Sequence, residues 1–265
     1  MDNRPIGVFD SGLGGVSVLY ELKKQLPNET FIYYGDTLHA PYGDQPPEKI
    51  KKYTRDAVDF LLEKQCKAIV IACNTATAVA VKELRSIFSF PIIGMEPALK
   101  PASLLQGEGK ILVMATSLTL SQDKFLQLML QYGKDALPLP CPGLVECIEK
   151  ENWEIDEINN KLINLLQPYI KQKLKAVVLG CTHYIFIKKM IKVILGEETI
   201  LIDGNNGTAN ELHRRLKISG LETSSQEKGT IHFYSSKKGK KCTDIMKKML
   251  AFLEESKQLE TGKIN

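Results

Sequence analysis

The chain has 265 residues, of which 43% are hydrophobic and 25% are charged, and its net charge is only +4 at pH 7. These values are ordinary for a folded protein with a buried core, and so small a charge gives no support to nucleic-acid binding. The first residues lack the apolar h-region of a signal peptide, and no apolar run approaches the ~18 residues of a membrane span, so neither feature is expected. Its six cysteines form no CxxC pair, so free thiols in the cytoplasm are expected.

Predicted strands and helices alternate through the first part of the chain. Apolar, β-branched runs predict strands at 6–10, 30–34, 67–73 and 91–95. Helical spacing of apolar residues predicts helices at 19–26, 47–61 and 76–88. The segment 37–46 has no apolar period, so it is either an ordinary turn or a lid that faces a substrate.

The same order of elements begins again at residue 110. Strands are expected at 111–114, 175–180 and 199–203, with a short extended piece at 137–142. Helices are expected at 121–132, 154–172 and 184–195. Ser121 would cap the first of these helices, and Pro168 would break the second. Four strands followed by four strands indicate an internal duplication, and the alternation with helices indicates parallel sheets.

The remaining tail is predicted to hold a helix at 210–218, a strand at 230–234 and a helix at 244–255. It has no counterpart of the repeated cysteine described below, so we expect it to pack on the first unit. The predicted fold class is therefore α/β, with two pseudo-symmetric, doubly wound domains of mainly parallel strands and an active site in the crevice between them. The expected domains are residues 1–97 with 208–265, and residues 98–207.

The clearest repeat ends on a cysteine in both copies. The two segments are Lys67-Ala-Ile-Val-Ile-Ala-Cys73 and Lys175-Ala-Val-Val-Leu-Gly-Cys181. Each predicts a buried strand followed by a helix, and open α/β sheets bind ligands at this carboxyl edge of their strands. The residues that follow the cysteines are of N-cap types, namely Asn74 and Thr182. The positive helix ends would therefore lower the pKa of both thiols and attract carboxylates.

Two thiols in one crevice suit proton transfer at the α-carbon of an amino acid. Moving that proton between the two faces requires a base on one side and an acid on the other, and two thiols can exchange these roles. Asp10 would lie beside Cys73, although an aspartate before a glycine turn also commonly binds its own backbone. His183 is close enough in sequence to act as the proton partner of Cys181.

Other chemistries have weaker support. No lysine is marked for a pyridoxal cofactor, so no cofactor is expected. No metal is expected either, and the lack of a CxxC pair weakens a zinc-ribbon reading. Packing is the expected role of the other cysteines, Cys66, Cys141, Cys147 and Cys242.

Four short motifs carry a family resemblance. They are Asp10-Ser11-Gly12-Leu13-Gly14-Gly15, Pro41-Tyr42-Gly43, Cys73-Asn74-Thr75 and Gly180-Cys181-Thr182-His183-Tyr184. As a set they resemble the cofactor-independent glutamate racemases, and the likeness runs from about residue 5 to 235. The resemblance implies the interconversion of L- and D-glutamate, the supply of D-glutamate to bacterial peptidoglycan, a two-domain α/β fold and a cytoplasmic homodimer. Neither nucleic acid nor membrane is an expected partner.

The resemblance also implies roles for individual residues. Cys73 and Cys181 would be the acid/base pair, with Asp10 assisting Cys73 and His183 assisting Cys181. The ammonium and carboxylates of the substrate would be held by Asp10, Ser11, Tyr42, Gly43, Asn74, Thr75, Thr116, Thr119, Thr182 and His183.

The family further places a glutamate near the second cysteine. Counting from Cys141-Pro142 puts it at Glu149, with Glu146 as the alternative. Some family members carry an N-terminal extension that is linked to activation by a cell-wall precursor. This chain begins at its first strand, so no such activation is expected.

Three alternatives stay open at the level of sequence. The first is a racemase of the same mechanism that acts on aspartate or another amino acid. The second is a two-domain binding module that holds an acidic ligand without chemistry, for which neither thiol would be essential. The third is a thiol hydrolase with one nucleophilic cysteine and His183, which leaves the repeated second cysteine without a role.

Overall fold

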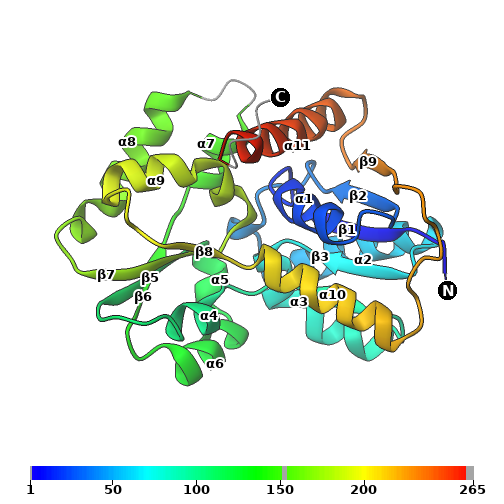
Figure 1. Ribbon diagram of the computed structural model, residues 1–265, viewed down its shortest axis with the longest axis horizontal. Coiled ribbons are helices and arrows are strands. Elements are labelled where there is room, and N and C mark those ends of the chain that lie inside the picture. Colours follow the sequence, from blue (N-terminus) through cyan, green and yellow to red (C-terminus); the bar gives the residue numbers. More distant parts are fainter. Residues whose placement is uncertain (1, 151–153, 261–265) are drawn as a thin grey trace.

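The computed structural model describes residues 2–150 and 154–260, and its strands form two separate sheets (Figure 1). Sheet A contains β1 (Ile6–Asp10), β2 (Phe31–Gly35), β3 (Ala68–Ile71), β4 (Ile92–Gly94) and β9 (Ile231–Ser235). Sheet B contains β5 (Lys110–Ala115), β6 (Ala136–Pro140), β7 (Leu174–Leu179) and β8 (Leu201–Asp203). Every pairing between these strands is parallel, which confirms the predicted α/β fold class.

The two sheets share one topology. Sheet A has the order β4-β3-β1-β2-β9, and sheet B read in the same sense has the order β8-β7-β5-β6. In both, the first strand of the unit is flanked by the second and the third, and the fourth strand lies beside the third. The internal duplication inferred from the cysteine repeat therefore extends to the whole sheet, and β9 is the additional strand.

Helices cover both faces of sheet A because its strands point alternate residues in opposite directions. Ile6 and Val8 of β1 pack under one group of helices, α1 (Val16–Gln25), α10 (Asn205–Ile218) and α11 (Lys241–Glu260). Phe9 points to the opposite core, which is closed by α2 (Pro47–Glu63) and α3 (Asn74–Ile87). Figure 1 shows the tail helices α10 and α11 on the lobe that contains sheet A and the N-terminus.

Sheet B is covered in the same way. Leu112 and Met114 pack with the helices α7 (Leu144–Glu149), α8 (Ile155–Leu166) and α9 (Lys188–Leu195). Ile111 and Val113 pack on the other face, which carries α4 (Leu99–Ser103) and α6 (Asp123–Tyr132). The short helix α5 (Ser117–Ser121) follows directly after β5.

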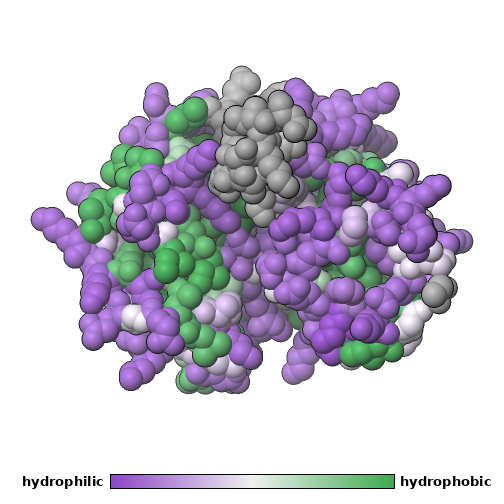
Figure 2. All heavy atoms as spheres, viewed as in Figure 1, coloured by the Kyte–Doolittle hydropathy of each residue, from purple (hydrophilic) through white to green (hydrophobic). Residues whose placement is uncertain are grey.

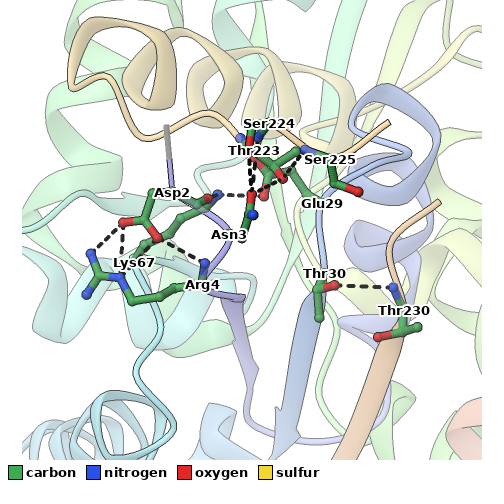
Figure 3. A network of polar contacts seen from close by, with 10 residues as sticks. All are labelled: Asp2, Asn3, Arg4, Glu29, Thr30, Lys67, Thr223, Ser224, Ser225 and Thr230. Carbon is green, nitrogen blue, oxygen red and sulfur yellow. Dashed lines mark hydrogen bonds and ion pairs between the residues drawn. The ribbon is translucent and has the colours of Figure 1, made fainter. Parts of the chain in front are cut away.

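The tail returns to sheet A and is held there by a polar network at the edge remote from the strand carboxyl ends (Figure 3). The ammonium of Lys67 lies 2.7 Å from the carboxylate of Glu29, and both side chains are buried. Glu29 also accepts a hydrogen bond from the Thr223 amide at 2.9 Å. The Thr223 hydroxyl donates to Asn3, at 2.8 Å, and Lys67 donates to the Asp2 carbonyl. We call these five residues the tail clamp.

Three expectations about helices differ from the structure. The helix expected at 121–132 is two helices, because Gln122 adopts an extended conformation between α5 and α6, and Ser121 ends α5 instead of capping α6. After Cys181 the chain first winds as a 3-10 helix over Thr182–Ile187, and α9 begins only at Lys188. The tail helix α10 begins at Asn205, so the domain boundary expected between 207 and 208 falls inside it. The break at Pro168 is confirmed, since α8 ends at Leu166.

The face drawn in Figure 2 is mainly hydrophilic, and apolar side chains that reach it gather mostly over the lobe that contains sheet B. Individually exposed apolar side chains are normal on folded proteins. Within the described residues, every helix is too short or too polar to cross a lipid bilayer.

Candidate active site

The candidate site is a pocket at the carboxyl ends of both sheets. The loops after β1 and β3 leave sheet A in opposite directions, and the loops after β5 and β7 do the same in sheet B, so both sheets present a topological switch point. These loops converge on a pocket of about 20 Å³, which is the room of about one water molecule. Eleven predicted site residues line it: Ser11, Tyr42, Gly43, Cys73, Asn74, Thr75, Thr116, Glu149, Cys181, Thr182 and His183. Asp10 and Thr119 are not in this lining and lie behind it, fully or almost fully buried.

Cys73 occupies the N-cap position of α3, where Asn74 was expected. Its sulfur accepts a hydrogen bond from the Ala76 amide at 3.4 Å and another from the Ser11 hydroxyl at 3.2 Å. These donors favour the thiolate, but burial and the nearby Asp10 oppose them and raise the pKa of Cys73 to about 12. The expected lowering of the Cys73 pKa is therefore wrong, because the loss of water around the sulfur outweighs the effect of the helix end.

Asp10 links the end of β1 to the glycine turn that follows. One carboxylate oxygen accepts hydrogen bonds from the amides of Gly12, at 3.2 Å, and Gly15, at 3.0 Å. The other oxygen lies 3.5 Å from the Thr182 hydroxyl, which comes from sheet B. Complete burial raises the pKa of Asp10 to about 6, against the attraction of His183 and the two amides. Both expectations for Asp10 are compatible with this geometry, because it caps its own turn and also approaches the pocket.

We expect Asp10→Asn to stabilise the protein at pH 7 by roughly 3 kcal/mol, because the pKa rises from 3.8 to about 6 on folding. Below pH 3.8 the carboxyl is neutral in both states and the gain is absent. The gain should grow as the pH rises towards 6 and then stay constant, which urea unfolding at several pH values measures. Asp59→Asn, on the exposed face of α2, is the matched control and should change stability by less than about 0.5 kcal/mol. An equal gain at pH 3 and pH 7 would contradict the burial argument.

Cys181, His183 and Glu149 form a connected group on the sheet B side. The sulfur of Cys181 lies 3.6 Å from Nδ1 of His183, and Nε2 of the same ring lies 2.8 Å from Oε1 of Glu149. Burial alone would lower the pKa of His183, but its hydrogen bonds with Cys181 and Glu149 outweigh burial and hold the pKa well above 6.5. Burial would raise the pKa of Glu149, and the contact with His183 overcomes this and lowers it. The group therefore favours a protonated imidazole beside a carboxylate.

Glu149, and not Glu146, is the glutamate that contacts His183. Glu149 is the last residue of α7, a six-residue helix that follows a left-handed Gly143. So short a helix has no apolar period from which it could be recognised. Cys141, one of the cysteines expected to serve in packing, is buried directly after β6. Its thiol donates to the Leu139 carbonyl at 3.4 Å, and it does not line the pocket.

Three threonines join the two halves of the pocket. The hydroxyls of Thr75, Thr116 and Thr119 lie within 2.8 to 3.0 Å of one another, with Thr75 from α3 and the other two from the segment after β5. Next to them, Asn74 is 5% exposed, and among the described residues no hydrogen-bond donor reaches its side-chain oxygen. A buried acceptor without a donor costs free energy unless a ligand satisfies it, so the side-chain oxygen of Asn74 is available to a hydrogen-bond donor.

The segment 37–46 is organised around a residue that sequence analysis missed. Asp36 is buried at the end of β2 and accepts a hydrogen bond from the Tyr42 hydroxyl at 2.6 Å. Nδ1 of His39 lies 2.9 Å from both of its oxygens, and the His39 ring stacks on Tyr53. Because Tyr42 and Gly43 line the pocket, Asp36 fixes the segment that covers it. The sequence signal that could have identified Asp36 is its position where a strand ends, since Asp10 ends β1 and Asp36 directly follows β2.

We expect Tyr42→Phe to reduce stability by about 1–3 kcal/mol, because it leaves the buried Asp36 carboxylate with one donor fewer. The same change should raise KM, since the covering segment loses its attachment. Urea unfolding and steady-state kinetics measure the two effects. Tyr53→Phe keeps the ring that stacks on His39 and serves as the control. Equal behaviour of the two variants would show that the Asp36 contact does not hold the segment.

The residues around the pocket also bear on metal and cofactor binding. In the part of the chain that the structure describes, no group of three or more His, Cys, Asp or Glu side chains is arranged to hold a metal ion. No lysine is among the lining residues at 40–43, 73–75 and 180–183, so a cofactor that needs a lysine aldehyde adduct has no anchor there.

The fold and the pocket define a class of protein: a duplicated α/β protein whose two thiols share one closed pocket between parallel sheets. Residues 6–212 match the model of the Asp/Glu/Hydantoin racemase family. A glutamate racemase from Clostridium perfringens is 48% identical over 253 residues, which is 94% of this chain and 97% of the relative. The chain belongs to the Asp/Glu/Hydantoin racemase family, whose racemases are isomerases.

Solved structures agree with this assignment. A crystal structure of a glutamate racemase from Bacillus anthracis is 30% identical, with a TM-score of 0.86 and 95% of each chain covered. A glutamate racemase from Francisella tularensis, solved in complex with D-glutamate, is 31% identical, with a TM-score of 0.80 and 95% of each chain covered.

Proposed function

We propose that the protein interconverts L- and D-glutamate by moving the α-proton between two cysteines, Cys73 and Cys181, without a cofactor. The observation that carries the proposal is that the two thiols follow equivalent strands of a duplicated fold, β3 and β7, and line the same pocket. One thiolate would remove the proton from one face of the α-carbon, and the other thiol would donate a proton to the opposite face. Reversal of the two roles gives the opposite direction.

The substrate must supply part of the activation. With a pKa raised to about 12, Cys73 is a thiol and not a thiolate at neutral pH. The ammonium group of an amino acid brings a positive charge, which would lower this pKa once it is bound near the sulfur. We place that ammonium at the unpaired oxygen of Asn74, with Asp10 behind it. On the other side, His183, which Glu149 holds in its protonated form, lies 3.6 Å from the sulfur of Cys181 and would exchange a proton with it.

The pocket as it stands is too small for glutamate. Its volume of about 20 Å³ holds about one water molecule, so substrate entry requires movement of the covering segment or of the two sheets. After entry, the threonine hydroxyls and the amides at the start of α3 would bind the carboxylates. Exclusion of water would strengthen these contacts as negative charge develops at the α-carbon.

Several wider roles follow from family membership. The known relatives include a glutamate racemase solved with D-glutamate, which supports glutamate as substrate. We further propose that the protein supplies D-glutamate to bacterial peptidoglycan, acts in the cytoplasm and works as a homodimer. Analytical ultracentrifugation at several concentrations tests the dimer.

Circular dichroism of L-glutamate and, separately, of D-glutamate tests the proposal. We expect both signals to decay to zero, because enantiomers have equal free energy, and the decay should persist with a chelator and without added cofactor. Aspartate is the competing substrate. Decay with aspartate alone would reassign the substrate, and no decay with either acid would favour a binding module.

A further inference from the structure

The glycine turn after β1 lies against the acid/base group of the other sheet. The Leu13 amide donates a hydrogen bond to Oε1 of Glu149 at 2.9 Å, and the Ser17 hydroxyl donates to the carbonyl of Thr182 at 3.1 Å. Leu13 itself is buried in the core of sheet A, so its amide is fixed to that sheet. The loop of one sheet therefore reaches the residues that accompany the thiol of the other.

This approach is possible only because two positions carry no side chain. A Cβ atom at Gly12 would lie 1.9 Å from Oε1 of Glu149, and one at Gly14 would lie 2.5 Å from Nδ1 of His183. Neither glycine adopts the left-handed backbone that would by itself favour glycine. Glycine is therefore needed at both positions because a side chain would collide with Glu149 or His183, and not because of the backbone conformation.

The contacts form a continuous path to the thiol. Oε1 of Glu149 accepts from the Leu13 amide and lies 2.8 Å from Nε2 of His183, and Nδ1 of that ring lies 3.6 Å from the sulfur of Cys181. The setting of Cys73 differs, because its sulfur receives hydrogen bonds from Ser11 and Ala76, which both follow strands of sheet A. The hydrogen bonds to Cys73 therefore come from its own sheet, whereas the group beside Cys181 includes a contact with the turn of the other sheet.

We propose that the turn Gly12–Gly14 is a seat on which Glu149 and His183 dock, and that the Leu13 amide is the positioning group that orients them towards Cys181. In this proposal, Glu149 and His183 reach their positions beside Cys181 only when the turn of sheet A contacts them. This inference rests on the proposed function, in which His183 assists Cys181. It adds that contact between the two sheets activates one thiol selectively.

The protonation of His183 provides a test that does not depend on turnover. The chain has four histidines, and the His183 signal in imidazole ¹⁵N NMR is assigned by its loss in His183→Asn. The titratable groups that face the ring are Cys181, Glu149 and Asp10. We expect His183 to stay protonated through neutral pH in the unaltered protein, and its midpoint to fall by about one pH unit or more in Gly12→Ala and Gly14→Ala.

Gly207→Ala is the matched control, because a Cβ at this position of α10 meets no atom within 4 Å. A second variant removes only the hydrogen bond: an ester in place of the Leu13 amide keeps the side chain and lacks the N–H. It should also lower the His183 midpoint, and it carries the test if an alanine variant does not fold. In folded variants we expect kcat to fall by about 10- to 100-fold with little change in KM.

The outcomes separate the two proposals. An unchanged His183 midpoint in the alanine and ester variants would overturn the seat, whatever their activity. A lowered midpoint in these variants together with no racemisation by the unaltered protein would support the seat and refute the proposed function. A lowered midpoint in Gly207→Ala as well would also overturn the seat, since the effect would not be local.

Discussion

Cys73→Ser and Cys181→Ser should each reduce kcat for glutamate racemisation by roughly 10²–10⁴-fold in both directions, because a hydroxyl is a far weaker acid than a thiol. Each change removes one of the two groups that must act on opposite faces of the α-carbon. The pocket keeps its shape, so KM should change much less than kcat. Polarimetric assays that start from each enantiomer measure both constants.

Cys141→Ser is the matched control for both variants. Cys141 is equally buried at the same edge of sheet B, and burial raises its pKa to about 12, as it does for Cys73. It does not line the pocket, so its replacement should leave most of the activity. If either Cys73→Ser or Cys181→Ser kept activity within about tenfold of the unaltered protein, the two-thiol mechanism would be wrong.

Lys67→Met should lower the free energy of unfolding by about 3–5 kcal/mol, because it leaves the carboxylate of Glu29 buried without its cation. Glu29 is 4% exposed, so water cannot replace the ammonium. Urea unfolding measures the loss. Lys110→Met is the control, because Lys110 also lies at the start of a strand and pairs with a carboxylate, that of Asp135. Both of these side chains are about half exposed, so the loss of stability should stay below about 1 kcal/mol.

The same variant tests the domain division that we propose, in which the tail belongs to the first domain and residues 98–207 form the second. The tail clamp joins Asp2 and Asn3, Glu29, Lys67 and Thr223, and β9 pairs with β2, which supports this division (Figure 3). Because α10 begins at Asn205, we place the second boundary at Gly204. Hydrogen exchange in Lys67→Met should therefore increase first in β9 and the segment before it. Faster exchange that began in sheet B would contradict the division.

Most of the fold could be predicted from the repeated segment that ends on a cysteine. Two copies of a strand that ends on cysteine predicted two parallel sheets of equal topology, and both cysteines lie at switch points. The α7 helix was not predicted, because six residues after a left-handed Gly143 show no period. The split between α5 and α6 depends on the extended backbone of Gln122, for which the sequence has no marker.

Several features of the site depend on contacts in space that the sequence pattern does not reveal. Glu149 was located by resemblance and not by pattern, since its contact with His183 spans 34 residues of chain. The pKa of Cys73 was predicted in the wrong direction because a helix start can be read from sequence, whereas complete burial cannot. Asp36 and the seat at Gly12–Gly14 depend on which side chains approach them in space.

Proton NMR of L-glutamate in D₂O with the protein and no added cofactor follows the α-proton itself. We expect the α-proton signal to disappear as solvent deuterium enters, while the β- and γ-protons remain and D-glutamate accumulates. An α-proton signal that persists over the time in which the folded protein is saturated with glutamate would contradict proton transfer at this pocket.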